Sequence, residues 1–191
     1  MSKTKQTATL GMFTAIIVVL QLISYVVKIG TFNLSLVLIP IVLGAYLYGA
    51  KVGAFLGTVF GVVVTICCFT GMDSGGYILV SASPILTSLV CIVKGTAAGF
   101  LSGLAANLLK GKNDTLAIMV CAIIAPVANT GIFCAAMVLF FKDILTSWAG
   151  GTNLVTYIIV GLTGVNFVIE LVLNIITAPA LLQVQKAIKR I

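Results

Sequence analysis

The sequence predicts an all-α, polytopic membrane protein in which residues 1–191 form one bundle of six transmembrane helices. Of its 191 residues, 61% are hydrophobic and only 8% are charged, and the mean hydropathy is +1.26. A soluble domain of this composition would have too few polar residues to cover its surface. The apolar residues also form runs close to the ~20 residues with which a helix crosses a bilayer.

Polar and glycine-rich breaks divide these runs and justify each span in order. The first span ends at Lys28-Ile-Gly30, and only Gly49-Ala-Lys51 separates the second span from the third. That short connection predicts a tight antiparallel hairpin. Longer breaks at 70–83, 110–114 and 142–153 delimit the fourth, fifth and sixth spans. The predicted helices are residues 7–27, 33–49, 52–70, 84–108, 116–141 and 154–182.

The basic residues predict the orientation of the bundle. With a cytoplasmic N-terminus, eight of the eleven basic residues lie on the cytoplasmic side and only two lie outside. This positive-inside bias places both termini in the cytoplasm of a multi-pass protein of the cell membrane. It places segments 70–83 and 142–153 outside, where they act either as lids or as plain connections. The eight cytoplasmic residues are Lys3, Lys5, Lys51, Lys110, Lys112, Lys186, Lys189 and Arg190; the two external ones are Lys28 and Lys142.

Small residues recur at intervals of four in three of the predicted helices. Such stripes let helix backbones approach closely, and packing within one bundle is the favoured interpretation for the two glycine stripes. A shorter stripe near the cytoplasmic end of the first helix is either internal or a docking face for another membrane protein. The stripes are Gly53, Gly57 and Gly61; Gly95, Gly99 and Gly103; and Gly11 with Ala15.

Polar side chains interrupt the last three predicted helices and indicate a cavity. Asn166, Glu170 and Asn174 are spaced four residues apart, so one face of a helix carries all three. Lys94 and Asn129 lie in the neighbouring apolar spans. An ionisable side chain inside a membrane is costly unless it has a partner or faces a polar cavity, which makes these residues candidates for a functional site. The alternative is that Lys94 and Glu170 pair with each other only to hold the bundle together.

The sequence argues against catalysis by this chain. It contains no histidine, no Gly-x-Ser-x-Gly motif and no phosphate-binding loop, so neither hydrolysis of ATP nor a histidine-dependent active site is expected. Its five cysteines lie in apolar runs without zinc-site spacing, and neither a metal nor another cofactor is expected. Because the polar residues do not line up along the whole bundle, as a channel would require, a solute-binding module that depends on partners for energy is favoured; a channel or scaffold subunit is the alternative from a different class.

The chain resembles the substrate-binding S components of energy-coupling-factor (ECF) vitamin transporters. The resemblance covers nearly the whole chain and rests on the stripe from Gly11 to Ala15, the hairpin segment 36–57 and the pair Asn129-Thr130. It rests also on the pattern in the last helix, Asn166-Phe-Val-Ile-Glu170 followed by Asn174 and Pro179. The usual Ala-x-x-x-Ala of the first helix stands here as Gly11-x-x-x-Ala15, which keeps both positions small.

The resemblance implies a mechanism of uptake. Such a subunit binds a vitamin from outside and then associates with a membrane coupling protein and two cytoplasmic ATPases. Gly11 and Ala15 would contact the coupling protein, and Lys94, Asn129, Asn166 and Glu170 would be substrate-binding candidates by position. A lysine suits a ligand carboxylate, while the amides and Glu170 suit hydroxyl and amide groups. The chain has only one tryptophan for stacking a flat ring, so pantothenate is favoured, with riboflavin and other vitamins open.

Overall fold

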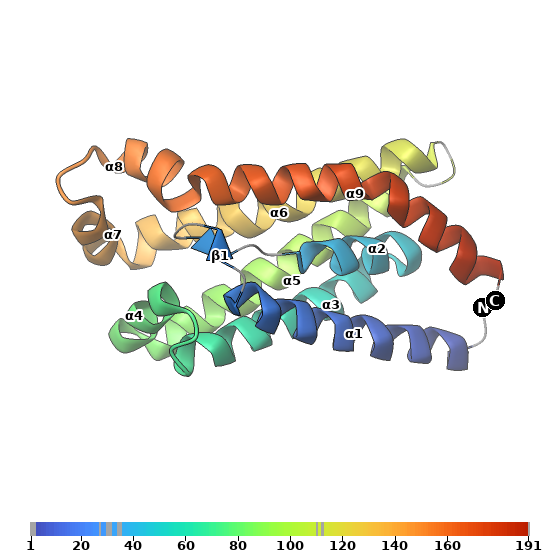
Figure 1. Cartoon of the computed structure of the whole chain (residues 1–191), viewed down its shortest axis with the longest axis horizontal. Helices are drawn as coiled ribbons and strands as arrows, with labels where there is room; N and C mark the ends of the chain where they lie inside the picture. The colour runs from blue at the N-terminus through green and yellow to red at the C-terminus, as the bar shows by residue number, and fades with distance from the viewer. Residues whose placement is uncertain are drawn as a thin grey trace.

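The computed structural model is an elongated helical bundle, and it describes residues 3–26, 28, 29, 32, 33, 36–109, 111 and 113–190 (Figure 1). Its only strands in these ranges are two residues long and pair antiparallel, with Lys28 opposite Asn33. The all-α prediction is therefore confirmed, with this short hairpin as its exception. The elements are α1 (Lys3–Val26), β1 (Lys28–Ile29), β2 (Phe32–Asn33), α2 (Leu38–Tyr48), α3 (Ala50–Phe69), α4 (Ser74–Ala82), α5 (Pro84–Leu109), α6 (Asp114–Phe140), α7 (Lys142–Ala149), α8 (Leu154–Thr156), the π-helix η1 (Tyr157–Gly164) and α9 (Val165–Arg190).

Four helices are long and apolar enough to cross a membrane within the described ranges. They are the segments Gln6–Tyr25, Ala50–Phe69, Pro84–Leu109 and Asp114–Phe140. Leu154–Gly164 and Asn166–Ala180, which meet at a bend of 46°, make a fifth span if this bent pair is counted as one. The predicted spans 7–27, 52–70, 84–108, 116–141 and 154–182 each correspond to one of these segments. The protein is thus a multi-pass membrane protein; Val27, the predicted end of the first span, lies outside the described residues.

The second predicted span, 33–49, is wrong in its length. The helix α2 has only 11 residues and starts at Leu38. At 1.5 Å per residue it is about 16 Å long, roughly half of a ~30 Å hydrocarbon core. Residue 33 belongs to β2, and residues 34 and 35 lie outside the described part of the chain. The described residues thus contain four helices of membrane length, a bent pair that makes a fifth span if counted as one, and α2 as a shorter apolar helix.

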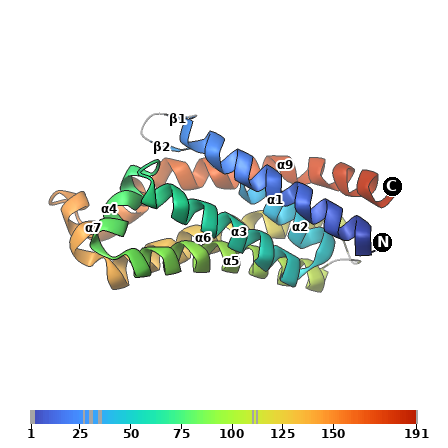
Figure 2. The same cartoon turned by 90° about the horizontal axis from the view of Figure 1, so that it is seen from below.

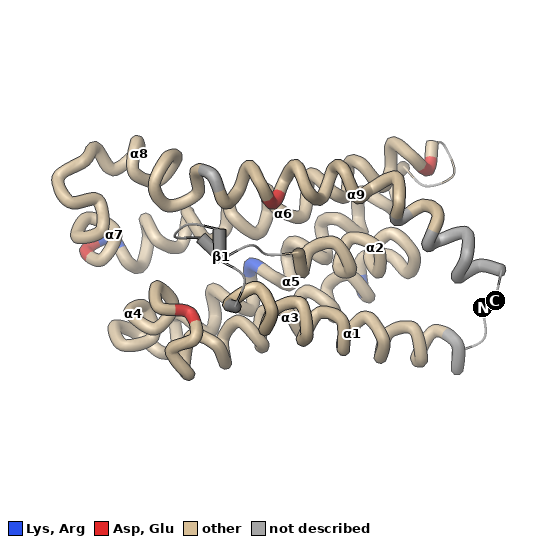
Figure 3. Tube along the Cα trace, in the orientation of Figure 1, with Lys and Arg blue, Asp and Glu red and all other residues tan. Residues whose placement is uncertain are grey.

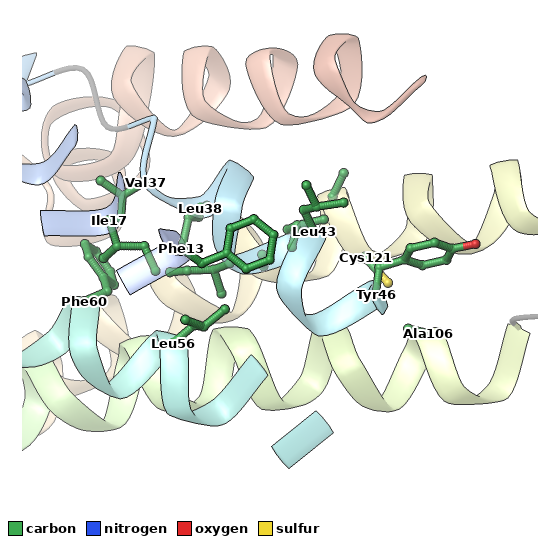
Figure 4. Packing of buried hydrophobic residues seen from close by; sticks show 14 of the residues in the cluster. Phe13, Ile17, Val37, Leu38, Leu43, Tyr46, Leu56, Phe60, Ala106 and Cys121 are labelled. Atoms are coloured by element: carbon green, nitrogen blue, oxygen red, sulfur yellow. The ribbon is translucent and has the colours of Figure 1, made fainter. Parts of the chain in front are cut away.

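The helix α2 is enclosed by other helices. It contacts α1, α3, α5, α6 and α9, and most of its residues are buried. Leu38, Leu43 and Tyr46 of α2 pack in a core with Phe13 and Leu56 (Figure 4). Its apolar sequence therefore reflects burial within protein rather than contact with lipid.

The tight turn predicted between the second and third helices is present at Gly49. This residue has a φ of +86°, in the region that favours glycine, and its amide donates to the carbonyl of Ala45 at 2.8 Å. The same glycine accepts a hydrogen bond from the amide of Gly53 at 3.0 Å. It thus ends α2 and begins α3 in one residue, which fixes the two helices as a hairpin.

The two glycine stripes pack against each other, as the internal interpretation predicts. A Cβ atom added to Gly53 would collide with the carbonyl oxygen of Gly99, and one added to Gly57 would collide with that of Gly95. At Gly61 an added Cβ would lie 2.6 Å from the carbonyl oxygen of Cys91. The backbones of α3 and α5 therefore touch along three turns, which is possible only because these positions lack side chains.

The segments 70–83 and 142–153, predicted as external loops, each contain a short helix. Asp73 caps α4 by accepting a hydrogen bond from the amide of Gly76 at 2.8 Å. The helix α7 follows Phe141 and ends at Gly150. Both helices lie at the end of the bundle opposite the first turn of α1 and the last turn of α9 (Figures 1 and 2). If these two segments act as lids, the lids are therefore the helices α4 and α7 rather than irregular loops.

Candidate functional site

The structure contains a cavity of about 510 Å³ between the helices. This volume falls within the ~300–1,000 Å³ of typical small-molecule sites. Its walls come from α1, α3, α5, α6, η1 and α9, and residues of α4 and α7 also line it. Because α4 and α7 contribute, the cavity lies toward the end of the bundle that is distant from the helix ends at the termini (Figure 1).

Lys94, on α5, lines this cavity near the middle of the membrane-length helix. Its ammonium nitrogen lies 5.0 Å from the centroid of the Phe133 ring, on α6. The negative face of an aromatic ring attracts a cation at this distance. Since a ring face accepts no conventional hydrogen bond, this contact leaves N–H groups of Lys94 available for an anionic or carbonyl group in the cavity.

Asn129, Asn166 and Glu170 line the same cavity as Lys94. Asn129 is on α6, and the other two lie one turn apart on α9. Glu170 is 5% exposed and Asn129 is 8% exposed. The structure thus brings together the four residues predicted as substrate-binding candidates, with few other charged positions along the middle of the bundle (Figure 3).

Asn174 shares the face of Glu170 but does not line the cavity. Its side-chain amide donates a hydrogen bond to the backbone carbonyl of Glu170 at 2.8 Å. The third polar residue of the predicted stripe therefore has a local role, because its side chain bonds to the backbone of its own helix one turn back.

The first helix contributes polar residues to the cavity that the sequence analysis did not single out. Gln21, Ser24 and Tyr25 lie on the inward face of α1, and all three are buried. The hydroxyl of Ser24 donates to the carbonyl of Gln21 at 2.7 Å. Residues spaced three and four apart lie on one face of a helix. This spacing in the sequence could therefore have indicated a polar face on the first helix.

Residues of α4 and α7 lie close together beside the cavity. A Cβ atom added at Gly75 would lie 3.8 Å from the Trp148 ring, so this ring of α7 lies close to the first turn of α4. Asp73 accepts a hydrogen bond from the hydroxyl of Tyr25 at 3.4 Å, which joins α1 to the start of α4. Asp73, Gly75, Tyr25 and Trp148 all line the cavity. These contacts connect both short helices to its walls.

The predicted docking residues Gly11 and Ala15 lie far from the cavity, on the exposed face of α1. Apart from the adjacent residues and backbone of α1 itself, no atom of the described residues lies within 4 Å of a Cβ built at Gly11, and Ala15 is exposed as well. This stripe therefore does not pack within the bundle, unlike the glycines of α3 and α5. Its face is open to lipid or to another protein.

The arrangement favours recognition over catalysis. The cavity offers one cation, two carboxylates, amide groups and hydroxyls, but its lining contains no histidine. Within the described ranges, no group of three or more His, Cys, Asp or Glu side chains could hold a metal ion. The fold and the cavity together define a multi-pass membrane protein with space for a small polar molecule inside its helical bundle.

Comparison with known proteins identifies the family. The family model "ECF transporter, substrate-specific component" matches residues 5–182, and the chain belongs to this family. The family comprises substrate-binding components of transporters rather than enzymes.

One curated relative is the pantothenic acid transporter PanT of Lactococcus lactis subsp. cremoris. It is 23% identical to this chain over 188 residues, which cover 94% of this chain and 93% of the relative. No solved structure matches the chain significantly.

Proposed function

We propose that this protein is the high-affinity substrate-binding subunit of an ATP-driven ECF-type importer for a water-soluble vitamin, with pantothenate as its substrate. The observation that carries the proposal is the solute-sized cavity lined by Lys94, Asn129, Asn166 and Glu170 within the bundle of a member of the ECF family. Pantothenate carries a carboxylate, two hydroxyls and an amide, and it has no aromatic ring. The relation to PanT at 23% identity supports the same substrate.

In this proposal Lys94 binds the carboxylate of the vitamin. The low-dielectric surroundings of a membrane helix strengthen the attraction between opposite charges relative to water. The Phe133 ring holds the ammonium group without neutralising it. Asn129, Asn166 and Glu170 then bind the hydroxyl and amide groups of the vitamin.

Riboflavin is the second candidate, because the cavity contains more aromatic side chains than the single tryptophan of the sequence suggests. Phe60, Phe133, Trp148, Tyr157 and Phe167 all line it. Aromatic side chains can stack on a flat ring system such as that of riboflavin. A lysine next to an anionic ligand favours pantothenate, whereas stacking on these rings favours riboflavin.

The energy for transport would come from partners. We propose that a membrane coupling protein binds the exposed face of α1 at Gly11 and Ala15, and that two cytoplasmic ATPases drive the complex. Both positions are small and no neighbour in the bundle packs on Gly11, so a partner helix could approach the backbone of α1 closely.

The proposed import direction requires cytoplasmic termini and a cavity in the outer half of the membrane. In a cysteine-free background, new cysteines at Ser74 and Ser147 should react with an impermeant thiol reagent added to intact cells. Both positions are exposed on α4 and α7. A cysteine at Asn113, at the opposite end of the bundle, should not react until the membrane is opened. The reverse labelling pattern would contradict the orientation and the import direction. Lys110 and Lys112, two of the predicted cytoplasmic lysines, lie outside the described residues.

A thermal-shift screen of the purified protein against vitamins tests the substrate. A vitamin present at about 1,000 times its dissociation constant should stabilise the folded protein by about 4 kcal/mol. Pantothenate should raise the melting temperature, and titration calorimetry in the presence of riboflavin should show whether the two compete. A shift with riboflavin alone would reassign the substrate. Stabilisation by no vitamin would favour a scaffold or channel subunit.

A further inference from the structure

We infer that Gln21 and Asn129 select ligands by accepting hydrogen bonds from them, so that the substrate must offer donors on two sides of the cavity. This inference rests on the proposed function, because it names what the same cavity recognises. It adds α1 to the substrate-binding elements. It is carried by two buried acceptor atoms rather than by the charges of the site.

The two side chains come from different helices and share one property. The side-chain oxygens Oε1 of Gln21, on α1, and Oδ1 of Asn129, on α6, are buried and have no hydrogen-bond partner. Gln21 is 4% exposed and Asn129 is 8% exposed, and both line the cavity. Most buried polar groups in folded proteins have a partner, so two such acceptors around one cavity require an explanation.

A buried acceptor without a donor destabilises the protein that contains it. Neither oxygen is accessible to solvent in the present conformation. The terminal torsion of an asparagine or glutamine amide is broad, however, so each amide can turn its oxygen toward the cavity without leaving its rotamer well. A ligand that brings a hydroxyl or amide N–H to each oxygen would remove both penalties at once. In the unliganded protein, these two acceptors would thus stay without donors until a ligand binds.

Lys94 adds the complementary requirement, since an ammonium group donates hydrogen bonds and accepts none. The preferred ligand therefore combines an anionic or carbonyl group facing α5 with hydroxyl or N–H donors facing α1 and α6. Pantothenate meets this description through its carboxylate, its two hydroxyls and its amide N–H. A ligand with acceptors alone would leave both oxygens without donors.

The test combines the melting temperature of the unliganded protein with ligand affinity. The variants are Gln21→Met and Asn129→Leu, which keep much of the side-chain volume and remove the acceptor. Gln183→Met is the matched control, because Gln183 is exposed on α9 and does not line the cavity. Without ligand, Asn129→Leu should melt at or above the temperature of the wild type, since an unmet acceptor has been removed. Because the side chain of Gln21 also hydrogen-bonds Tyr25, Gln21→Met is compared in a Tyr25→Phe background, where it should likewise not lower the melting temperature. A clear decrease in either melting temperature would show a structural role and overturn the inference for that residue.

With pantothenate, each cavity variant should bind about five- to tenfold more weakly, which corresponds to the loss of one hydrogen bond. Three analogues, each lacking one donor (either hydroxyl, or the amide N–H by methylation), should identify the donors. The analogue that lacks the donor to Gln21 should bind Gln21→Met and the wild type with equal affinity. A different analogue, which lacks the donor to Asn129, should bind Asn129→Leu and the wild type with equal affinity. Equal losses for pantothenate and all three analogues would contradict direct donation.

The two proposals fail differently. If the wild type binds another vitamin of the screen, the choice of pantothenate fails and the same comparison is made with that vitamin and its donor-blocked analogues. If it binds none, the proposed function fails, and the melting temperatures of the unliganded variants still decide whether the oxygens are unmet acceptors.

Discussion

The pair Lys94 and Glu170 provides the strongest test of the site, because charge removal has opposite consequences for a ligand-binding lysine and a structural ion pair. The perturbations are Lys94→Met, Glu170→Gln and the double substitution. Methionine keeps much of the lysine stem's volume, and glutamine keeps the shape of the carboxylate. Both residues line the cavity, and Glu170 is 5% exposed while Lys94 is half-buried.

The magnitude follows from the burial of Lys94. Two unit charges 4 Å apart attract by about 1 kcal/mol in water and by about 4 kcal/mol at the effective dielectric constant of ~20 that suits partly buried protein sites. A half-buried lysine falls between these limits. Lys94→Met should therefore weaken binding of an anionic vitamin by at least tenfold, or about 1.4 kcal/mol, while the empty protein stays folded.

A structural pair would behave differently. Removing one partner would leave the other charge buried and unpaired, which lowers stability by about 3–5 kcal/mol, and the double substitution would recover much of that loss. The assays are titration calorimetry for affinity and thermal unfolding for stability, applied to all three variants. Unchanged affinity in every variant, together with recovery of the melting temperature in the double variant, would refute the role of Lys94 in ligand binding.

Two further predictions concern the helix faces. Gly57→Ala should lower the stability by about 1–3 kcal/mol in thermal unfolding, because its Cβ would collide with the carbonyl of Gly95 on α5; Gly131→Ala, on the open face of α6, should be neutral or stabilising by up to about 1 kcal/mol. If Gly57→Ala is as stable as the control, the close approach of α3 and α5 is not required. Replacing Gly11 and Ala15 together with Leu should abolish co-purification with the coupling protein and transport into cells while leaving vitamin affinity unchanged. Normal assembly of that double variant would remove the face from the proposed interface.

Hydropathy predicted the long spans well but not the length of the second helix. An apolar run shows that a segment avoids water, but not whether its neighbours are lipid or protein. The helix α2 is surrounded by other helices, so its 11 residues are as apolar as a transmembrane segment without being long enough to cross. The helix α4 was missed because Gly75 and Gly76 stand in its first turn, where their low helix propensity outweighed the capping residue Asp73.

The ionisable residues of the candidate site could be predicted from the sequence, because a charged group inside a membrane is costly. Lys94 and Glu170 are conspicuous in apolar helices because an ionised group there needs a special environment. Gln21, Ser24 and Tyr25 were not singled out, because uncharged polar residues near the end of a span are common and tyrosine is frequent at membrane interfaces. The contacts of α4 and α7 with the cavity depend on the path of the chain, and no local pattern in the sequence encodes them.

The direct contact between the backbones of α3 and α5 also restricts how this protein can evolve. At Gly53, Gly57 and Gly99 every other amino acid adds an atom where a neighbouring carbonyl already lies, so these helix surfaces have almost no freedom to vary. The cavity walls on α1, α6, η1 and α9 are not restricted by this backbone contact. A descendant of this protein could therefore acquire a different cargo by substitutions on those four elements while the α3–α5 pair is inherited unchanged.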